Sequence, residues 1–160
     1  MKTKVSIVKC NSYDRLEVEH SVSRAFNLLG GLTSFIKKGE KVLIKPNMLS
    51  GSLPERGVNT HTEIVRAVVR LVKEAGAIPF IGDNPGGSVG ARQAYKDSGI
   101  WAVAEEEGVE CKDSEEVKVI RGLPVSSYFF ECDKIISLPK MKTHSLMTIT
   151  GAVKNMFGAV

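Results

Sequence analysis

The chain has 160 residues, of which 42% are hydrophobic and 25% are charged, and its formal net charge is +4. These values are typical of a globular protein and exclude a largely disordered chain. No apolar run reaches the roughly 18 residues that a membrane-spanning helix needs, and the first residues do not resemble a secretory signal. We therefore expect a cytoplasmic protein without a membrane partner, folded as a single domain over residues 1–160.

The basic residues and the cysteines exclude two further classes of protein. The 22 basic residues are spread among 18 acidic ones without a basic run, which predicts no nucleic-acid partner. The three cysteines, Cys10, Cys111 and Cys132, are widely spaced and contain no Cys-x-x-Cys pair. They favour neither a disulfide framework nor a four-thiolate zinc or iron–sulfur site, so we expect them to be small core residues.

In the first half of the chain, the spacing of the hydrophobic residues changes between the pattern of strands and the pattern of helices. The predicted elements are a strand at 4–10, a helix at 15–32, a strand at 41–46 and a polar loop at 47–59. The next helix is expected to begin at the capping box Thr60-x-x-Glu63 and to end at Gly76.

The second half continues the alternation of strands and helices. The predicted elements are a strand at 77–82, a turn at 83–87, a helix at 89–98 capped by Ser88, a helix at 100–107, a strand at 116–120, a turn at 122–124, a strand at 133–138 and a helix at 145–157. This order predicts a layered α/β/α fold with a mostly parallel sheet.

Polar and cationic residues follow the ends of three predicted strands. Because ligands bind beyond the carboxyl ends of parallel strands, the three loops are expected to share one rim of the sheet. Lysine and threonine side chains there are suited to a small anion, a carboxylate or a phosphate. The predicted ligand-binding residues are Lys45, Asn47, Lys140, Lys142, Thr143, Thr150 and Lys154.

Two loop histidines and one aspartate are the candidates for catalysis. His144 and His61 titrate near neutral pH and could transfer protons, while Asp83 could orient a base. The same three residues could form a His-His-Asp site for a divalent metal. Structural roles, as a loop histidine or an Asx turn, explain these residues equally well, and the sequence leaves both readings open.

Several stretches of the chain resemble a family of uncharacterised proteins. They are KVLIKPNML, THTEIVRAVVRLVKEAGA, IGDNPG and DKIISLPKMKTHSLMTITGAVKNMFGAV, which together extend over most of residues 41–160. These stretches resemble the domain of unknown function 362. The resemblance implies a redox-linked protein in which a ferredoxin-type domain with four-iron–four-sulfur clusters lies elsewhere in a longer polypeptide. Because members of the family are usually longer, this chain would be the N-terminal part of the family domain. It contains no cluster-binding cysteine motif, so the clusters would lie in the remaining part.

Two functions are consistent with these observations. In the first, the chain is an enzyme or one lobe of an enzyme that acts on a small anion. In the second, it is a non-catalytic module that binds an anionic ligand or a partner protein. The apolar residues Met156, Phe157 and Val160 near the chain end also predict an exposed C-terminal face through which the chain self-associates.

Overall fold

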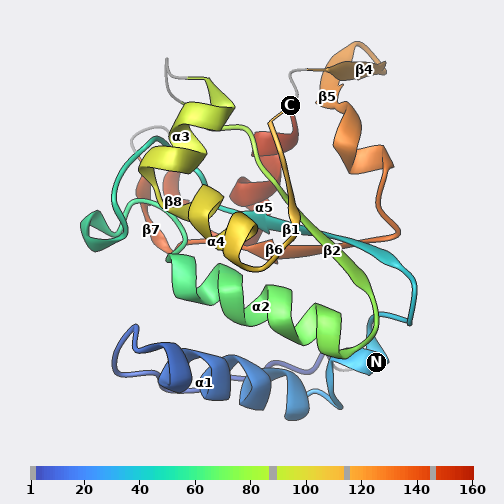
Figure 1. Cartoon of the computed structure of the whole chain (residues 1–160). Coiled ribbons are helices and arrows are strands. Elements are labelled where there is room, and N and C mark those ends of the chain that lie inside the picture. Colours follow the sequence, from blue (N-terminus) through green and yellow to red (C-terminus); the bar gives the residue numbers. More distant parts are fainter. Residues whose placement is uncertain (1–2, 87–89, 114–115, 145–146) are drawn as a thin grey trace.

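A four-stranded, entirely parallel sheet forms the centre of the molecule (Figure 1). The computed structural model describes residues 3–86, 90–113, 116–144 and 147–160. The strand order is β3-β2-β1-β6, and the strands are β1 (Lys41–Pro46), β2 (Ile78–Gly82), β3 (Glu110–Lys112) and β6 (Lys134–Leu138). The predicted α/β class with a parallel sheet is confirmed.

Helices and two small hairpins surround this sheet. The helices are α1 (Arg15–Asn27), α2 (Thr62–Glu74), α3 (Ala91–Asp97), α4 (Ile100–Glu106) and α5 (Ala152–Asn155). The short 3₁₀ turns are η1 (Leu32–Ser34), η2 (Pro54–Arg56), η3 (Ser127–Phe130) and η4 (Met156–Ala159). The antiparallel hairpins pair β4 (Val117–Ile120) with β5 (Leu123–Ser126) and β7 (Lys142–His144) with β8 (Thr148–Thr150). Among the described residues, no helix has the length and apolar character needed to cross a membrane.

The two faces of the sheet are covered unequally. Val42 and Ile44 point into the main core, which α2, α3 and α4 close, and α1 lies against the outer side of α2 (Figure 1). Leu43 points the other way and joins Phe80 and Tyr128 in a smaller core. The side chain of Lys45 shares this second face, since side chains alternate along a strand. Here η3 and α5 supply the cover, and α5 lies beside the carboxyl ends of the strands.

The start of α2 differs from the predicted capping box. His61 is the N-cap, and its Nδ1 accepts a hydrogen bond from the backbone of Glu63. The Thr60 hydroxyl instead accepts from the backbone of Asn47 at 2.8 Å and donates to the carbonyl of Leu138 at 2.5 Å. Thr60 therefore ties together the chain segments that leave β1 and β6.

The N-terminal prediction was partly wrong. Residues 4–10 form no strand, and Val5 and Ile7 are 78% and 90% exposed, because the alternation there meets no partner strand among the described residues. Cys10 is likewise exposed and not a core residue. The predicted helix at 15–32 begins as expected but ends at Asn27.

Two predictions in the second half of the chain need correction. The turn at 122–124 is shorter than predicted, because Leu123 already begins β5, and the hairpin that it forms lies outside the parallel sheet. Strand β3 was not predicted, since three residues of mixed polarity carry no clear period.

The predicted helix at 145–157 was wrong over residues 147–151. Residues 148–150 pair with 142–144 in a hairpin, and only α5 and η4 are helical. The apolar residues that suggested a helical stripe do not face a core: Ile149 and Val153 are both exposed. The predicted start of this helix at 145, and the Ser88 cap of α3, lie outside the described residues.

Candidate functional site

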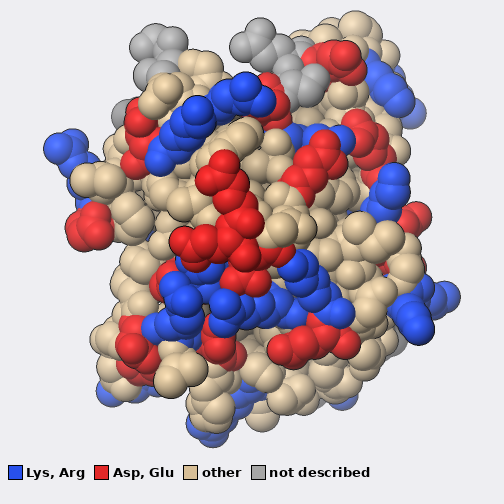
Figure 2. Space-filling model, viewed as in Figure 1, with Lys and Arg blue, Asp and Glu red and all other residues tan. Residues whose placement is uncertain are grey.

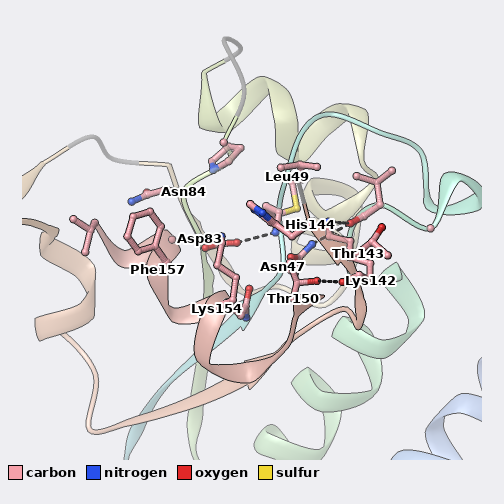
Figure 3. A pocket seen from close by; sticks show the side chains of 18 residues that line it. Asn47, Leu49, Asp83, Asn84, Lys142, Thr143, His144, Thr150, Lys154 and Phe157 are labelled. Atoms are coloured by element: carbon pink, nitrogen blue, oxygen red, sulfur yellow. Dashed lines mark hydrogen bonds between the residues drawn. The ribbon is translucent and has the colours of Figure 1, made fainter. Parts of the chain in front are cut away.

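A cavity of about 580 Å³ opens at the carboxyl ends of the strands (Figure 3). Its walls come from the segments that follow β1, β2 and β6 and from the C-terminal segment that contains α5 and η4. This volume is typical of a small-molecule site. Among the residues that line it are the predicted site residues Asn47, Asp83, Lys142, Thr143, His144, Thr150 and Lys154.

A buried ion pair forms the floor of the cavity. The Lys45 ammonium contacts Asp83 Oδ1, and the two side chains are 0% and 3% exposed. The backbone N–H of Met48 donates to Asp83 Oδ2 at 2.8 Å. Lys45 Nζ also lies 3.4 Å from Asn155 Oδ1, in α5. Both carboxylate oxygens of Asp83 therefore already accept hydrogen bonds from the protein.

Burial disfavours the charged forms of both Asp83 and Lys45. It raises the pKa of Asp83 to about 6, although Lys45 and the Met48 N–H favour the carboxylate, and it lowers the pKa of Lys45. A buried ion pair of this kind contributes little to stability, because the desolvation of two charges offsets their attraction. Shifted pKa values inside a cavity are typical of functional sites.

The raised pKa of Asp83 predicts a specific pH dependence of stability. Between pH 3.8 and about 6, the folded chain holds a proton that the unfolded chain has released. The stabilisation that arises from the raised pKa of Asp83 is therefore complete below pH 3.8 and is lost as the pH rises through about 6. Relative to Asp83→Asn, the free energy of unfolding of the native chain should fall by about 3 kcal/mol over this interval. Urea unfolding of both proteins from pH 4 to pH 7 measures this difference, and a difference that stays flat or grows with pH contradicts the assignment.

Two buried tyrosines fix the turn that carries Asp83. The Tyr95 hydroxyl, from α3, donates to the backbone carbonyl of Asp83 at 2.6 Å. The Tyr128 hydroxyl, from η3, donates to Asn84 Oδ1 at 3.1 Å. A Cβ at Gly82 would lie 2.8 Å from the Tyr128 ring, so only glycine allows this close packing. These contacts fix the backbone at Asp83, while Lys45 and the Met48 N–H fix its carboxylate.

The C-terminal segment closes the cavity over the ion pair. Asn155 Nδ2 donates to Ser137 Oγ, in β6, at 3.0 Å, and this bond anchors α5 to the sheet. Gly158 lies directly against the ion pair, since a Cβ there would be 2.6 Å from Asp83 Oδ1 and 3.1 Å from Lys45 Nζ. Sequence reasoning missed both Asn155 and Gly158 as site residues. The KNMFG stretch that contains them was nevertheless part of the family resemblance and pointed to this segment.

Two lysines from different elements contribute positive charge to the cavity. Lys142, in β7, donates from Nζ to the carbonyl of Val58 at 2.5 Å. Lys154, in α5, has its Nζ 5.3 Å from the centroid of the Phe157 ring. Burial and the nearby charge of Lys154 lower the pKa of Lys142. Within the described part of the chain, neither ammonium forms an ion pair with a carboxylate.

Two other predicted ligands shape the cavity through bonds within the protein. The Thr150 hydroxyl lies 2.9 Å from the carbonyl of Lys140 and 3.1 Å from that of Lys142, and it ties the base of the hairpin. Asn47 Nδ2 donates to the carbonyl of Val58 at 3.0 Å. These bonds hold the walls formed by the loop after β1 and by β7.

Three of the predicted site residues do not line the cavity. Lys45 lies beneath it, with Asp83 between. Lys140 turns outward, and its Nζ lies 3.1 Å from the hydroxyl of Tyr13. His61 stacks on the Tyr13 ring with 3.7 Å between centroids, and burial lowers its pKa. Tyr13, which sequence reasoning did not consider, therefore holds two of these residues away from the site.

The residues proposed for a metal are not brought together. His61 lies outside the cavity that Asp83 and His144 line, and the described ranges contain no group of three His, Cys, Asp or Glu residues placed to hold a metal. The cysteines do not converge either: Cys111 packs on the main core and Cys132 on the smaller core across the sheet. Among the described residues, the predicted His-His-Asp site is therefore not assembled.

The face of α2 and α4 carries mixed charge and contrasts with the cavity. Figure 2 shows basic and acidic side chains side by side across this face. Arg66 of α2, which is buried, pairs with Glu63, Glu106 and Glu107, and Arg70 shares Glu107. On this face the two signs of charge are compensated in a network that joins the helices.

Comparison with known proteins places the chain in a family. It is 37% identical over 170 residues to the thylakoid-associated protein sll1697 of Synechocystis sp. (strain ATCC 27184 / PCC 6803 / Kazusa), and the match covers 100% of this chain and 51% of that protein. The chain thus spans about half the length of this curated relative. No solved structure matches it. The model of the family described as "Domain of unknown function (DUF362)" matches residues 42–160, and the chain therefore belongs to the DUF362 family.

Proposed function

We propose that the cavity at the carboxyl ends of the strands binds a small anion, a carboxylate or a phosphate. One observation carries this proposal: Lys142 and Lys154 line the same cavity from separate elements without a carboxylate partner among the described residues. The only carboxylate in the described lining, that of Asp83, is already neutralised by Lys45. A bound anion would relieve the repulsion between these two ammonium groups.

Binding of inorganic phosphate by isothermal titration calorimetry tests this proposal. Lys142→Met and Lys154→Met are each expected to weaken binding about tenfold or more, because each removes a charge-assisted contact. Lys118→Met is the matched control, since Lys118 also lies over an aromatic ring, that of Phe130, but outside the cavity. Phosphate binding that is absent, or equally weak in all four proteins, would refute the proposal.

The first of the two proposed roles for this cavity is catalysis by the groups that line it. His144 Nδ1 accepts a hydrogen bond from the backbone of Met147, so the neutral ring carries its proton on Nε2. His144 and Asp83 are the lining residues suited to proton transfer, whereas His61 is remote from the cavity. An enzyme that uses Asp83 should show activity that changes near pH 6, because burial raises the pKa of that carboxyl to about 6. A non-catalytic module, the alternative, should instead show affinity that depends mainly on salt.

A redox link through iron–sulfur clusters is a second part of the proposal and rests on the family resemblance. The clusters and their ferredoxin-type domain would belong to a longer protein that includes this chain. Elemental analysis that finds iron in such a longer protein but not in this chain would support the link, and absence of iron from both would end it.

Location and self-association also stay predictions. The Synechocystis relative is named for its association with thylakoids, whereas the sequence predicts a cytoplasmic protein. Of the three residues on which the predicted self-association depends, Phe157 and Val160 are exposed and Met156 is partly buried. Light scattering at increasing concentration tests it, and a strictly monomeric chain would contradict it.

A further inference from the structure

The cavity combines its positive charge with apolar side chains that are open to solvent. Phe157, 67% exposed, and Leu49, 47% exposed, both line it, and in the view of Figure 3 they lie on either side of Asp83. Met48, Val58 and Pro85 extend this apolar lining. An inorganic anion would leave the exposed surfaces of Phe157 and Leu49 without an apolar partner.

The charged and apolar parts are also adjacent. Lys154 and Phe157 are three residues apart, and the Lys154 ammonium lies 5.3 Å from the centroid of the Phe157 ring. An anion at this ammonium would therefore place whatever group it carries against the ring. The volume of about 580 Å³ is much larger than an inorganic ion needs and falls in the range of sites for organic ligands.

From this juxtaposition we infer that the ligand is an amphipathic organic anion, with a flat or branched apolar group next to its charge. The inference rests on the proposed anion site and deepens it by naming the class of ligand. The ammonium groups of Lys142 and Lys154 hold the charge. The Phe157 ring and the Leu49 side chain contact the apolar group, and burial of that group supplies the rest of the affinity.

Four probes separate the charge from the apolar group: naphthoate, acetate, inorganic phosphate and the neutral naphthalenemethanol. Naphthoate is expected to bind about tenfold or more tightly than acetate or phosphate, because its rings bury apolar area that the other two lack. Naphthalenemethanol is expected to bind more weakly than naphthoate, since it carries no charge for the lysines.

Two variants assign these effects to residues. Phe157→Ser should weaken naphthoate about fivefold or more and leave phosphate unchanged, whereas Lys154→Met should weaken both. Phe130→Ser is the matched control, because Phe130 is an exposed ring beneath a lysine outside the cavity. Thermal unfolding verifies that each variant folds, as expected for exposed side chains.

The outcomes distinguish this inference from the proposal on which it rests. Equal affinity for naphthoate and phosphate, with no effect of Phe157→Ser on either, would overturn the amphipathic ligand and leave the anion site standing. Equal affinity for naphthoate and naphthalenemethanol would also overturn it, because the charge would then be irrelevant. Failure of every anion to bind would overturn both.

Discussion

Asp83→Leu is expected to lower the free energy of unfolding by about 3–5 kcal/mol, the largest effect that we predict for a single substitution. The reason is that Lys45 is completely buried and would lose its carboxylate partner. From the part of the chain that the structure describes, two weaker contacts would remain for its ammonium, the Pro46 carbonyl at 3.5 Å and Asn155 Oδ1 at 3.4 Å. Urea unfolding followed by circular dichroism measures the loss.

The double variant Lys45→Met/Asp83→Leu separates this explanation from simple loss of packing. Because it removes both buried charges and keeps similar volumes, it is expected to recover most of the stability that Asp83→Leu loses. Removal of the exposed Arg92–Asp113 pair is the control and should change the free energy by less than about 1 kcal/mol. A double variant as unstable as Asp83→Leu would contradict the account of the ion pair.

Gly158→Ala is the second large effect that we expect. A Cβ at this position would lie 2.6 Å from the Asp83 carboxylate, which is too close for any real contact. Both side chains of the buried pair are almost completely buried, and the Met48 N–H also holds the carboxylate. The C-terminal segment would have to shift away from the sheet, at a cost of about 1–3 kcal/mol. The shift would also separate Lys154 from the rest of the cavity and weaken phosphate binding.

Gly151→Ala serves as the control for this substitution. Gly151 belongs to the same segment, has an extended φ of −159°, and would place a Cβ in open space. Its unfolding and its phosphate affinity should match those of the native chain. If Gly158→Ala is as stable and binds as tightly as Gly151→Ala, then η4 does not close the cavity in the way we describe.

The parts of the fold that could be predicted are those where burial dictates the residue type. Val42, Leu43 and Ile44 of β1 are all buried, and such a continuous apolar run is typical of a strand that is covered on both faces. The C-terminal region could not be predicted in this way. Its apolar residues Ile149, Val153 and Phe157 are exposed, so their helical spacing does not correspond to a helix with a buried face.

The candidate site was predictable to the extent that it follows from topology. Parallel strands bring their carboxyl ends to one edge, and this rule placed Asn47, Asp83 and Lys142 together before their contacts were known. The buried pair of Lys45 and Asp83 was not predictable, because its partners lie 38 residues apart and pair only through the register of β1 and β2. Nor did the sequence indicate that Tyr13 would hold His61 and Lys140 elsewhere.

The most direct test of the anion site is the anomalous diffraction of selenate in crystals of this chain. Selenate carries the charge and shape of a tetrahedral anion, and its scattering locates it without reference to any assay. The account predicts a peak inside the cavity, beside the ammonium groups of Lys142 and Lys154. Selenate bound only at lysines outside the cavity, such as Lys118, with an empty cavity in the same crystal, would contradict it.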